Sequence, residues 1–372
     1  MNFDLSEDES MLKSVAERFV VDRYDHDRRH RYLAETNGFS ADNWRHLGDL
    51  GLIATAFSAE AGGLGASPTD ITVIFEALGR GLVVEPLLES AVLAGGLFER
   101  IAPTAVQAEW LEGLVTGTRR LAVAHREVAA RHNPNRVETT ATRVGDGWVI
   151  DGDKSIVPAG AGADAYIVSA RMSGAPTSPD GVGFFLVPAD ADGLVIVPYR
   201  TIDGAVACAL TLRGVTAVTP LGGDLGDLEL AQARASLARC AEALGIMETL
   251  FAATLDYLRT RKQFGVAIGS FQALQHRMVA QYTAIEQSRS LLYLAVVTDP
   301  ADQAAWLRSI AGTRAFMSDA SVALGHEMIQ LHGGMGVTDE LVIGHGHKRL
   351  VMLSRYPDTA DNALDTFAGI AA

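Results

Sequence analysis

The sequence predicts an α+β protein with three successive parts: an N-terminal helical domain (residues 1–118), a middle antiparallel β domain (119–222) and a C-terminal four-helix bundle (223–372). Three observations predict this order. Helix start signals recur in the first part, short β-branched runs separated by turn residues fill the second, and long amphipathic stripes occupy the third. A chain of 372 residues is also longer than one core of ordinary size requires.

The first part shows three helix start signals. Ser6 is followed three residues later by Glu9, which together make a capping box. A second helix is expected to start at Ser40, and a third at Pro68–Asp70, where proline suits the first helical position. Between them, the glycine-rich stretch Ala61–Gly65 is expected to form a loop.

About six short strands are expected in the middle part. They follow one another without a helical pattern between them, which favours an antiparallel sandwich or barrel over a parallel sheet. Their expected positions are Leu121–Ala124, Trp148–Ile150, Ala165–Ala170, Gly183–Val187, Leu194–Val197 and Ala207–Leu212.

Long helices are expected in the third part. Apolar residues recur at helical spacing through Leu237–Leu258, Leu274–Val296 and Ile310–Met328. A further helix near residues 346–356 would complete an antiparallel bundle of four.

Charge and composition exclude several classes of function. The chain has 31 basic and 45 acidic residues, and its only dense basic cluster is Arg259–Lys262, so no nucleic-acid partner is expected. No apolar run approaches the roughly 20 residues of a membrane span, and the acidic amino terminus is unlike a signal peptide. Two cysteines, Cys208 and Cys240, allow at most one disulfide, which fits a reducing compartment. We therefore expect a cytoplasmic protein without membrane contact.

Two catalytic or nucleotide motifs are incomplete. The stretch Ala159–Asp164 is rich in glycine and alanine, but a dinucleotide-binding loop must open a helix, and here a strand follows. There is no Gly-x-Ser-x-Gly elbow, and neither cysteine has an evident electropositive setting. A hydrolase would thus have no recognisable nucleophile.

The histidine patterns predict no metal site. His326 and His332 do not have the spacing of a zinc-protease helix, because the second histidine would have to replace Gln330. His345 and His347 have no third ligand at a family spacing. We expect them to be exposed loop histidines.

The most informative stretch is Arg259–Gly265. Cations near the end of a helix are often only a charged cap. Here the basic cluster is isolated in an acidic chain and is followed by the aromatic Phe264 and the amide of Gln272, which suits an anionic diphosphate attached to a flat heterocycle. The segment Gln330–Gly336 adds a glycine-rich turn whose backbone can approach a nucleotide closely.

With these motifs, the chain resembles the acyl-CoA dehydrogenase family over essentially its whole length, and most of all the small subunit of pimeloyl-CoA dehydrogenases. The family resemblance rests on four pieces, and the narrower one on the amino terminus and the basic segment. The four pieces of the family resemblance are Ala61–Gly65, Trp148–Lys154, Arg261–Gly265 with Gln272, and Gln330–Gly334. The two segments of the narrower resemblance are Asp4–Ser6 and Tyr257–Gly265.

The resemblance implies FAD bound at a subunit interface and α,β-dehydrogenation of an acyl-CoA thioester, in which a glutamate takes the α-proton and the flavin takes the β-hydride. It also implies that neighbouring subunits share each FAD site. The half that a subunit gives to its neighbour's flavin is present: Arg261 for the pyrophosphate, Phe264 and Gln272 beside the nucleotide, and the turn with Gln330, Gly333 and Gly334.

The half that holds a subunit's own flavin departs from the family. The chain has His125–Ala129 where the family has Thr-Glu-Pro followed by Gly-Ser-Asp, and Ile156–Pro158 where it has Trp-Ile-Thr. The family's catalytic glutamate falls on Pro357, with Asp358 next to it, and the alternative family position falls on Ala235. No catalytic residue is therefore expected in this chain.

We accordingly expect the non-catalytic subunit of a hetero-oligomeric acyl-CoA dehydrogenase, an α2β2 heterotetramer with a homologous subunit, with electron-transfer flavoprotein or a similar protein as acceptor. Two alternatives are a self-sufficient homomeric enzyme, using Asp358 or an unrecognised base, and a flavin-free scaffold protein. Retention of Arg261 and Gln272 beside loss of the other half favours the first, because a relic would lose both halves alike. The acyl group is open among dicarboxylic, aromatic and steroid-derived thioesters.

Overall fold

The computed structural model describes residues 5–369 and divides the chain into two compact units. Unit 1 comprises Met1–Arg31, Ser67–Val83 and Ser236–Ala372, and unit 2 comprises Tyr32–Ala66 and Val84–Ala235. Asp4, which belongs to the amino-terminal resemblance, lies outside the described residues. The division into three domains by sequence position stays a prediction.

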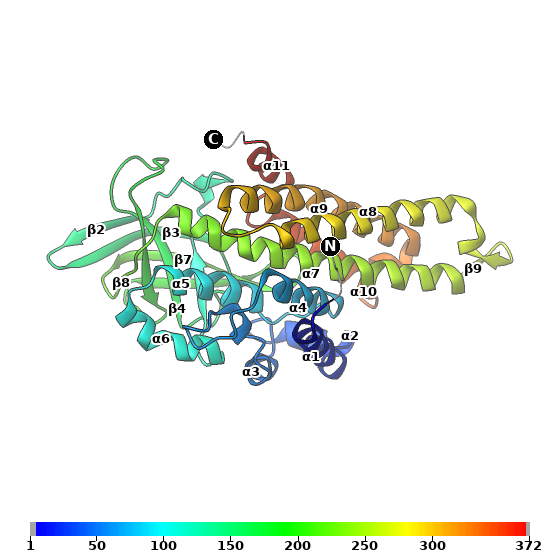
Figure 1. Cartoon of the computed structure of the whole chain (residues 1–372), viewed down its shortest axis with the longest axis horizontal. Helices are drawn as coiled ribbons and strands as arrows, with labels where there is room; N and C mark the ends of the chain where they lie inside the picture. Colours follow the sequence, from blue (N-terminus) through cyan, green and yellow to red (C-terminus); the bar gives the residue numbers. More distant parts are fainter. Residues whose placement is uncertain (1–4, 370–372) are drawn as a thin grey trace. The chain divides into compact units, whose positions relative to one another are not determined.

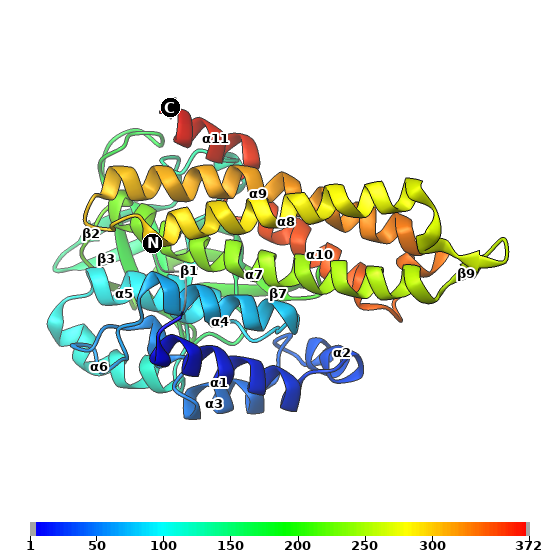
Figure 2. The same cartoon turned by 45° about the vertical axis from the view of Figure 1, so that its right-hand side comes forward.

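Unit 1 is helical. It combines α1 and α4 from the amino-terminal part of the chain with the long carboxyl-terminal helices, which lie side by side in Figures 1 and 2. Its helices, of which α2 and α7 belong to it only in part, are α1 (Glu7–Arg23), α2 (His26–Ala34), α4 (Pro68–Arg80), α7 (Leu225–Thr260), α8 (Gln272–Val297), α9 (Gln303–His332), α10 (Val342–Arg355) and α11 (Ala360–Ala368).

The helix starts in unit 1 follow from their capping residues. The Ser6 hydroxyl accepts a hydrogen bond from the Glu9 amide at 3.2 Å, while the Glu9 carboxylate accepts one from the Ser6 amide at 2.6 Å. Ser67 caps α4 in the same way, with Pro68 as the first helical residue. Both predicted starts are confirmed. The fourth bundle helix, α10, begins at Val342, a few residues before the predicted position.

Two glycines allow α4 and α7 to lie backbone to backbone. A Cβ atom on Gly79 would lie 2.3 Å from the Glu242 carbonyl oxygen, and one on Gly245 would lie 2.1 Å from the Glu76 carbonyl oxygen. Any larger residue would push the helices apart. The contact is reinforced by Arg80, which lies 2.8 Å from the Glu248 carboxylate.

Unit 2 contains one eight-stranded sheet within the described residues. Its order is β6-β7-β3-β2-β4-β5-β8, with β1 paired to β4. The strands are β1 (Leu121–Ala124), β2 (Thr140–Val144), β3 (Gly147–Pro158), β4 (Ala165–Arg171), β5 (Val182–Pro188), β6 (Leu194–Arg200), β7 (Val206–Val215) and β8 (Thr219–Pro220).

The six predicted strands are confirmed, but the purely antiparallel arrangement needs correction. β1 pairs with β4 in parallel, from Leu121 opposite Ala165 to Ala124 opposite Val168. The β2–β3 hairpin lies between them in sequence and permits the crossover that a parallel pair requires. β2 and β8 were not predicted.

The rest of unit 2 consists of short helices and turns. These are α3 (Ala41–Asp49), the 3₁₀ turns η1 (Ala54–Ala56) and η3 (Val128–Ala130), the π-helix η2 (Leu87–Gly95), α5 (Gly96–Ile101) and α6 (Thr104–Thr116). Ser40 caps α3 as predicted, by accepting a hydrogen bond from the Asn43 amide. Over residues 5–369, no helix has both the length and the apolar character needed to cross a membrane.

Candidate functional site

The segment after α7 forms an exposed hairpin. β9 (Lys262–Gln263) pairs antiparallel with β10 (Val266–Ala267), and the hairpin extends beyond the ends of α7 and α8 in Figures 1 and 2. Phe264 occupies its turn with 91% of its surface exposed and with φ at +54°, a backbone region that large side chains rarely adopt. Its ring makes an edge contact with Phe271, at 6.2 Å between centroids. A strained, exposed aromatic residue is typical of a contact surface.

Arg261 presents a guanidinium group that has no hydrogen-bond or ion-pair partner among residues 5–369. Its backbone is fixed, because its amide donates to the Tyr257 carbonyl at 2.8 Å and its carbonyl accepts from the Ile268 amide at 2.9 Å. Arg259, two residues earlier, lies 3.6 Å from the Asp256 carboxylate instead. Of these two arginines, only Arg261 lacks an acidic partner within residues 5–369.

The other predicted site residues are also exposed. Gln272 is the first residue of α8, and Gln330 lies near the end of α9. Gly333 begins the 3₁₀ turn η5 (Gly333–Val337) with φ at +58°, and a Cβ atom on Gly333 or Gly334 would meet nothing within 4 Å. The space over this turn is therefore open to a ligand.

A stacked pair joins the two segments that carry these residues. The rings of Tyr257, on α7, and His332, at the end of α9, lie 4.4 Å apart with planes 24° from parallel. The Tyr257 hydroxyl donates to the His332 carbonyl at 3.4 Å. The side chains of Arg261, Gln272 and Gln330 themselves share no hydrogen bond within the described part of the chain.

An apolar hollow of about 540 Å³ lies between α7 and α8, next to the hairpin. Ala267 of β10 borders it, as do Gly269 and Ser270 of the following turn. Most of its wall consists of apolar and aromatic side chains, namely Phe251, Leu255, Leu258, Met278, Val279 and Tyr282. Apolar surface of this kind beside an exposed aromatic hairpin is typical of a protein–protein contact.

In unit 2, the stretch after β1 is occupied by a buried ion pair. The Lys154 ammonium lies 2.7 Å from the Glu127 carboxylate, and both side chains are almost inaccessible. Glu127 also accepts hydrogen bonds from the hydroxyl and amide of Thr139 at 2.6 and 3.0 Å and from the Glu138 amide at 2.7 Å. Ser169 completes the network, 3.2 Å from the Lys154 ammonium. These contacts use the carboxylate fully.

The same network shifts the pKa values of its members. Burial lowers the pKa of Lys154 to about 8, and Glu127 opposes this shift. Burial alone would raise the pKa of Glu127, but the charge and the hydrogen bond of Lys154, with hydrogen bonds from Thr139 and Glu138, leave it below its ordinary value. Burial, followed by the Lys154 cation, also lowers the pKa of His125. A buried, fully bonded ion pair holds the fold rather than a ligand.

Near the end of β3, the half-buried residues Ile156 and Pro158 offer no polar side chain to a ligand. Ile156 forms a backbone bridge with Arg126, and Pro158 pairs with Ala207 of β7. Val157 between them points into the core and is fully buried. Ile156 has no hydroxyl or amide side chain, and Pro158 has no N–H.

Asp358 is held in an ion pair. Its carboxylate accepts a hydrogen bond from the Arg314 guanidinium, which also donates to the carbonyl oxygens of Leu353 and Tyr356 at 3.0 and 2.8 Å. Arg314 is only 3% exposed, so this arrangement is fixed. The Asp358 carboxylate is therefore held by a buried cation.

Matches to known proteins cover nearly the whole chain. Sequence models of the acyl-CoA dehydrogenase N-terminal, middle and C-terminal domains match residues 6–118, 122–215 and 228–356. Acyl-CoA dehydrogenase FadE27 of Mycobacterium tuberculosis is 30% identical over 313 residues, which cover 80% of this chain and 79% of that protein. The chain belongs to the acyl-CoA dehydrogenase family.

Solved structures of this family share the fold. A structure described as the Tcur3481–Tcur3483 steroid ACAD is 30% identical with a TM-score of 0.87, covering 98% of this chain and 97% of that one. The ChsE4–ChsE5 complex of Mycobacterium tuberculosis is 25% identical with a TM-score of 0.88, covering 99% and 98%. PigA with FAD and proline is also 25% identical, with a TM-score of 0.89 and coverage of 100% and 99%. The narrower resemblance to pimeloyl-CoA dehydrogenase small subunits stays a prediction.

FAD is the cofactor of this family, and the residues of this chain suit only one part of an FAD site. The guanidinium of Arg261, which has no partner in the described part of the chain, and the open turn at Gly333 suit an anionic diphosphate. In unit 2, the Glu127 carboxylate is already paired with Lys154 of β3, and Pro158 has no N–H to donate to a flavin ring. The two parts of the site thus differ in the chemistry they offer.

The glycine-rich stretch Ala159–Asp164 has a structural role. The carbonyl oxygens of Ala161 and Gly162 accept hydrogen bonds from the Arg120 guanidinium at 2.9 and 2.6 Å, and the Asp164 carboxylate accepts one from the Arg120 amide at 2.6 Å. Burial lowers the pKa of Arg120 to about 10. The loop therefore wraps a buried cation.

Both cysteines are free thiols. Cys208 and Cys240 are buried, and burial raises the pKa of each to about 11. Neither is a nucleophile at neutral pH.

The expectation of exposed loop histidines at His345 and His347 is wrong. Both lie on α10; His345 is buried and His347 is half-buried. Burial lowers the pKa of each. His345 packs against His26 and His30 of α2, and His347 packs against His326 of α9. These contacts join segments that are distant in the sequence, so no local pattern predicts the burial.

Proposed function

We propose that this chain is the non-catalytic subunit of a hetero-oligomeric, FAD-dependent acyl-CoA dehydrogenase. It contributes Arg261, Phe264, Gln272 and the Gln330–Gly334 turn to the ADP part of an FAD held by a homologous subunit. When bound there, FAD accepts the hydride from the β-carbon of the acyl-CoA thioester. The observation that carries the proposal is a contrast: Arg261 is exposed and has no partner among the residues that the structure describes, whereas the Asp358 carboxylate is held by Arg314.

The exposed residues of the hairpin support the proposal that this chain contributes FAD contacts to a neighbouring subunit. Within one chain, an unpaired guanidinium and a 91%-exposed phenylalanine on the same hairpin gain nothing for stability. Against a partner's diphosphate, Arg261 makes charge-assisted hydrogen bonds, and Phe264 covers apolar surface. The adjoining 540 Å³ hollow offers the partner further apolar contact.

The residues at the two positions of the family's catalytic glutamate support the proposal that this chain has no general base. Pro357 and Ala235 have no ionisable group, and Ala235 is fully buried. Asp358 is one methylene shorter than glutamate and is engaged by Arg314. A general base must reach the proton it takes with a free lone pair, so the base belongs to the partner.

The stretch that holds a subunit's own flavin in the family supports the same assignment. Here Glu127 and Lys154 form a closed network, the half-buried side chain of Ile156 carries no polar group, and Pro158 has no N–H. A flavin ring at this position would lose its polar contacts. We therefore assign one FAD to each pair of unlike subunits in an α2β2 heterotetramer.

Two similar structures support a two-component assembly and a class of substrate. The Tcur3481–Tcur3483 protein and the ChsE4–ChsE5 complex are each named by two components, and the former is described as a steroid ACAD. A steroid-derived CoA thioester is thus the first substrate to test, ahead of dicarboxylic and aromatic thioesters. Electron-transfer flavoprotein or a similar protein is the proposed acceptor.

The test is the flavin content of two preparations. The chain is expressed alone and together with a homologous acyl-CoA dehydrogenase subunit, and the visible spectrum and bound FAD of each preparation are measured. We expect a colourless or strongly substoichiometric preparation of the chain alone. The complex is expected to be yellow, with about one FAD per heterodimer, because binding requires both half-sites.

Two results would contradict the proposal. Full FAD occupancy in the isolated chain would support a self-sufficient enzyme. A complex that forms without FAD would support a flavin-free scaffold. In the first case, steady-state turnover of the isolated chain with a CoA thioester would show whether the chain has a base of its own.

A further inference from the structure

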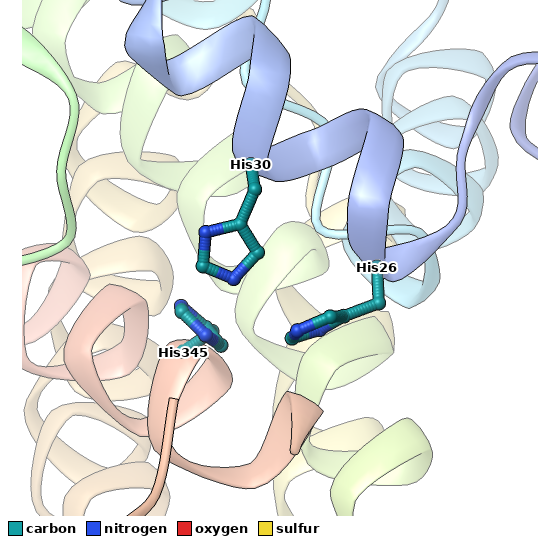
Figure 3. A group of neighbouring side chains, drawn as sticks. All are labelled: His26, His30 and His345. Atoms are coloured by element: carbon teal, nitrogen blue, oxygen red, sulfur yellow. The ribbon is translucent and has the colours of Figure 1, made fainter. Parts of the chain in front are cut away.

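Three histidines from distant parts of the sequence converge in unit 1. His26 and His30 lie one turn apart on α2, and His345 lies on α10, so 315 residues separate His30 from His345. One nitrogen of each imidazole lies within 4.8 Å of the others. Figure 3 shows the three rings turned toward a common point between the two helices.

The rings are in mutual contact. The His26 and His30 rings lie 4.6 Å apart, and His345 lies 5.4 Å from the first and 4.7 Å from the second, between ring centroids. All three pairs meet edge to face. Such a triad is a ligand set for a borderline divalent ion, because neutral imidazole is a preferred ligand of Zn²⁺, Ni²⁺ and Cu²⁺.

We propose that His26, His30 and His345 form a binding site for a divalent transition metal, with Zn²⁺ as its natural occupant, that fastens α2 to α10. The site uses none of the residues proposed for the FAD half-site. Its role is structural.

The spacing suits zinc after small side-chain movements. Zn–N bonds of about 2.0–2.1 Å set the nitrogens of a tetrahedral site roughly 3.3 Å apart. Nitrogens now up to 4.8 Å apart must therefore close by about 1.5 Å at most, which rotation of the imidazoles supplies. His26 and His30 hold their relative position, since residues four apart share one face of a helix.

The surroundings of His345 orient its ring as in a metal site. Its Nε2 lies 3.0 Å from the Asp339 carbonyl oxygen, which places the N–H there and leaves a lone pair on Nδ1. Metal-bound histidines characteristically donate their other N–H to such a carbonyl. His345 is 7% exposed, so the ring cannot turn away into solvent.

The structure also shows room for a fourth metal ligand and the charged groups near the site. His26 and His30 are half-buried, which leaves water access to the metal for a fourth ligand. The exposed Asp339 carboxylate, 3.6 Å from His345 Nε2, supplies negative charge beside the ion. Two cations near the site oppose binding of a metal ion. Lys348 lies 3.7 Å from the Asp339 carboxylate. Arg29 of α2, which acts electrostatically on His345, donates to the Leu82 carbonyl at 3.0 Å.

The test uses the full-length chain, produced without a polyhistidine tag and stripped with a chelator. Zn²⁺ binding is measured by calorimetry and by the thermal unfolding midpoint, and Co²⁺ is used as a spectroscopic probe. We expect one equivalent of Zn²⁺, an increase in the midpoint with added Zn²⁺, and the visible bands of four-coordinate Co²⁺. His30→Gln and His26→Gln are each expected to weaken Zn²⁺ binding by more than about tenfold, because each removes a ligand.

His276→Gln is the matched control, because His276 is an exposed histidine on α8. It should leave affinity, stoichiometry and the Co²⁺ spectrum unchanged. The half-buried His26 provides a variant that folds even if one at the buried His345 does not. The proposal is overturned if Zn²⁺ neither binds with one-to-one stoichiometry nor raises the midpoint, or if His276→Gln reduces affinity as much as His30→Gln.

Discussion

Tyr257 and His332 stack with their ring centroids 4.4 Å apart, and this contact joins the end of α7 to the end of α9. The hairpin with Arg261 follows the first residue, and the turn with Gly333 follows the second. This aromatic pair therefore contributes to the relative position of both proposed nucleotide-binding segments.

Replacing Tyr257 should weaken FAD retention without touching the cofactor. Tyr257→Leu removes a stacked pair worth about 0.5–1.5 kcal/mol, so FAD should dissociate from the complex about two- to tenfold more readily. Tyr257→Phe keeps the ring and loses only the 3.4 Å hydrogen bond, so it should behave like the natural chain. The measurement is the FAD dissociation constant of the complex by fluorescence. Equal effects of both substitutions would show that the hydroxyl, rather than the ring, aligns the segments.

Arg261 should matter most for holding the diphosphate. Its charge-assisted hydrogen bonds are worth about 1.5–3 kcal/mol, so Arg261→Ala should weaken FAD retention by about ten- to a hundredfold. Arg259→Ala is the control, because Arg259 pairs with Asp256 at 3.6 Å on the exposed surface. Ultrafiltration of the two complexes at a series of FAD concentrations measures both effects. If both variants lose FAD equally, the cluster acts only through diffuse positive charge.

The two glycines of the turn should respond differently to alanine. Gly333 has φ at +58°, so Gly333→Ala introduces backbone strain of about 1–3 kcal/mol and should lower the unfolding midpoint. Gly334 has no such φ, and its Cβ position is open, so Gly334→Ala should fold normally. It should still weaken FAD retention, because the added methyl group occupies the space into which a nucleotide would fit. Unchanged FAD affinity in Gly334→Ala would exclude a close approach there.

The buried Glu127–Lys154 pair should make unit 2 sensitive to acid. The pKa of Glu127 is below its ordinary value of 4.5, so its stabilising contribution is complete above that value and is lost as the pH falls through the lower folded-state pKa. The urea midpoint should therefore fall from about pH 5 downward. Glu127→Gln should cost about 3–5 kcal/mol at pH 7 and should flatten this acid dependence. An unchanged slope below pH 5 in the variant would assign the acid sensitivity to other carboxylates.

The sequence predicted the elements whose signals are local. Ser6 and Glu9, or Ser67 and Pro68, fix helix starts within one turn of chain, and the long apolar stripes indicate α7, α8 and α9. The six expected strands were found for the same reason. The parallel pairing of β1 with β4 was missed, because it joins segments that are separated by the β2–β3 hairpin.

In the candidate site, too, residues with a local sequence signal were predicted and contacts between distant segments were not. Arg261 was singled out by a basic cluster within seven residues, and the structure leaves it exposed. The histidine triad was not predicted, because His26 and His30 belong to a helix that the sequence analysis did not identify, and His345 lies 315 residues beyond His30. The ion pair of Asp358 with Arg314 was likewise invisible, since the partners are 44 residues apart.

The central claim is that this chain performs no chemistry, and the turnover of the complex with Asp358→Asn tests it most directly. Asparagine keeps the size of the side chain and an oxygen that accepts from Arg314, but it cannot take a proton. With FAD content and assembly verified, the steady-state rate with a CoA thioester and an artificial electron acceptor should stay within about a factor of three of the natural complex. A fall in this rate of about a hundredfold or more, the usual contribution of a general base, would contradict the account. It would show that Asp358 of this chain takes part in catalysis.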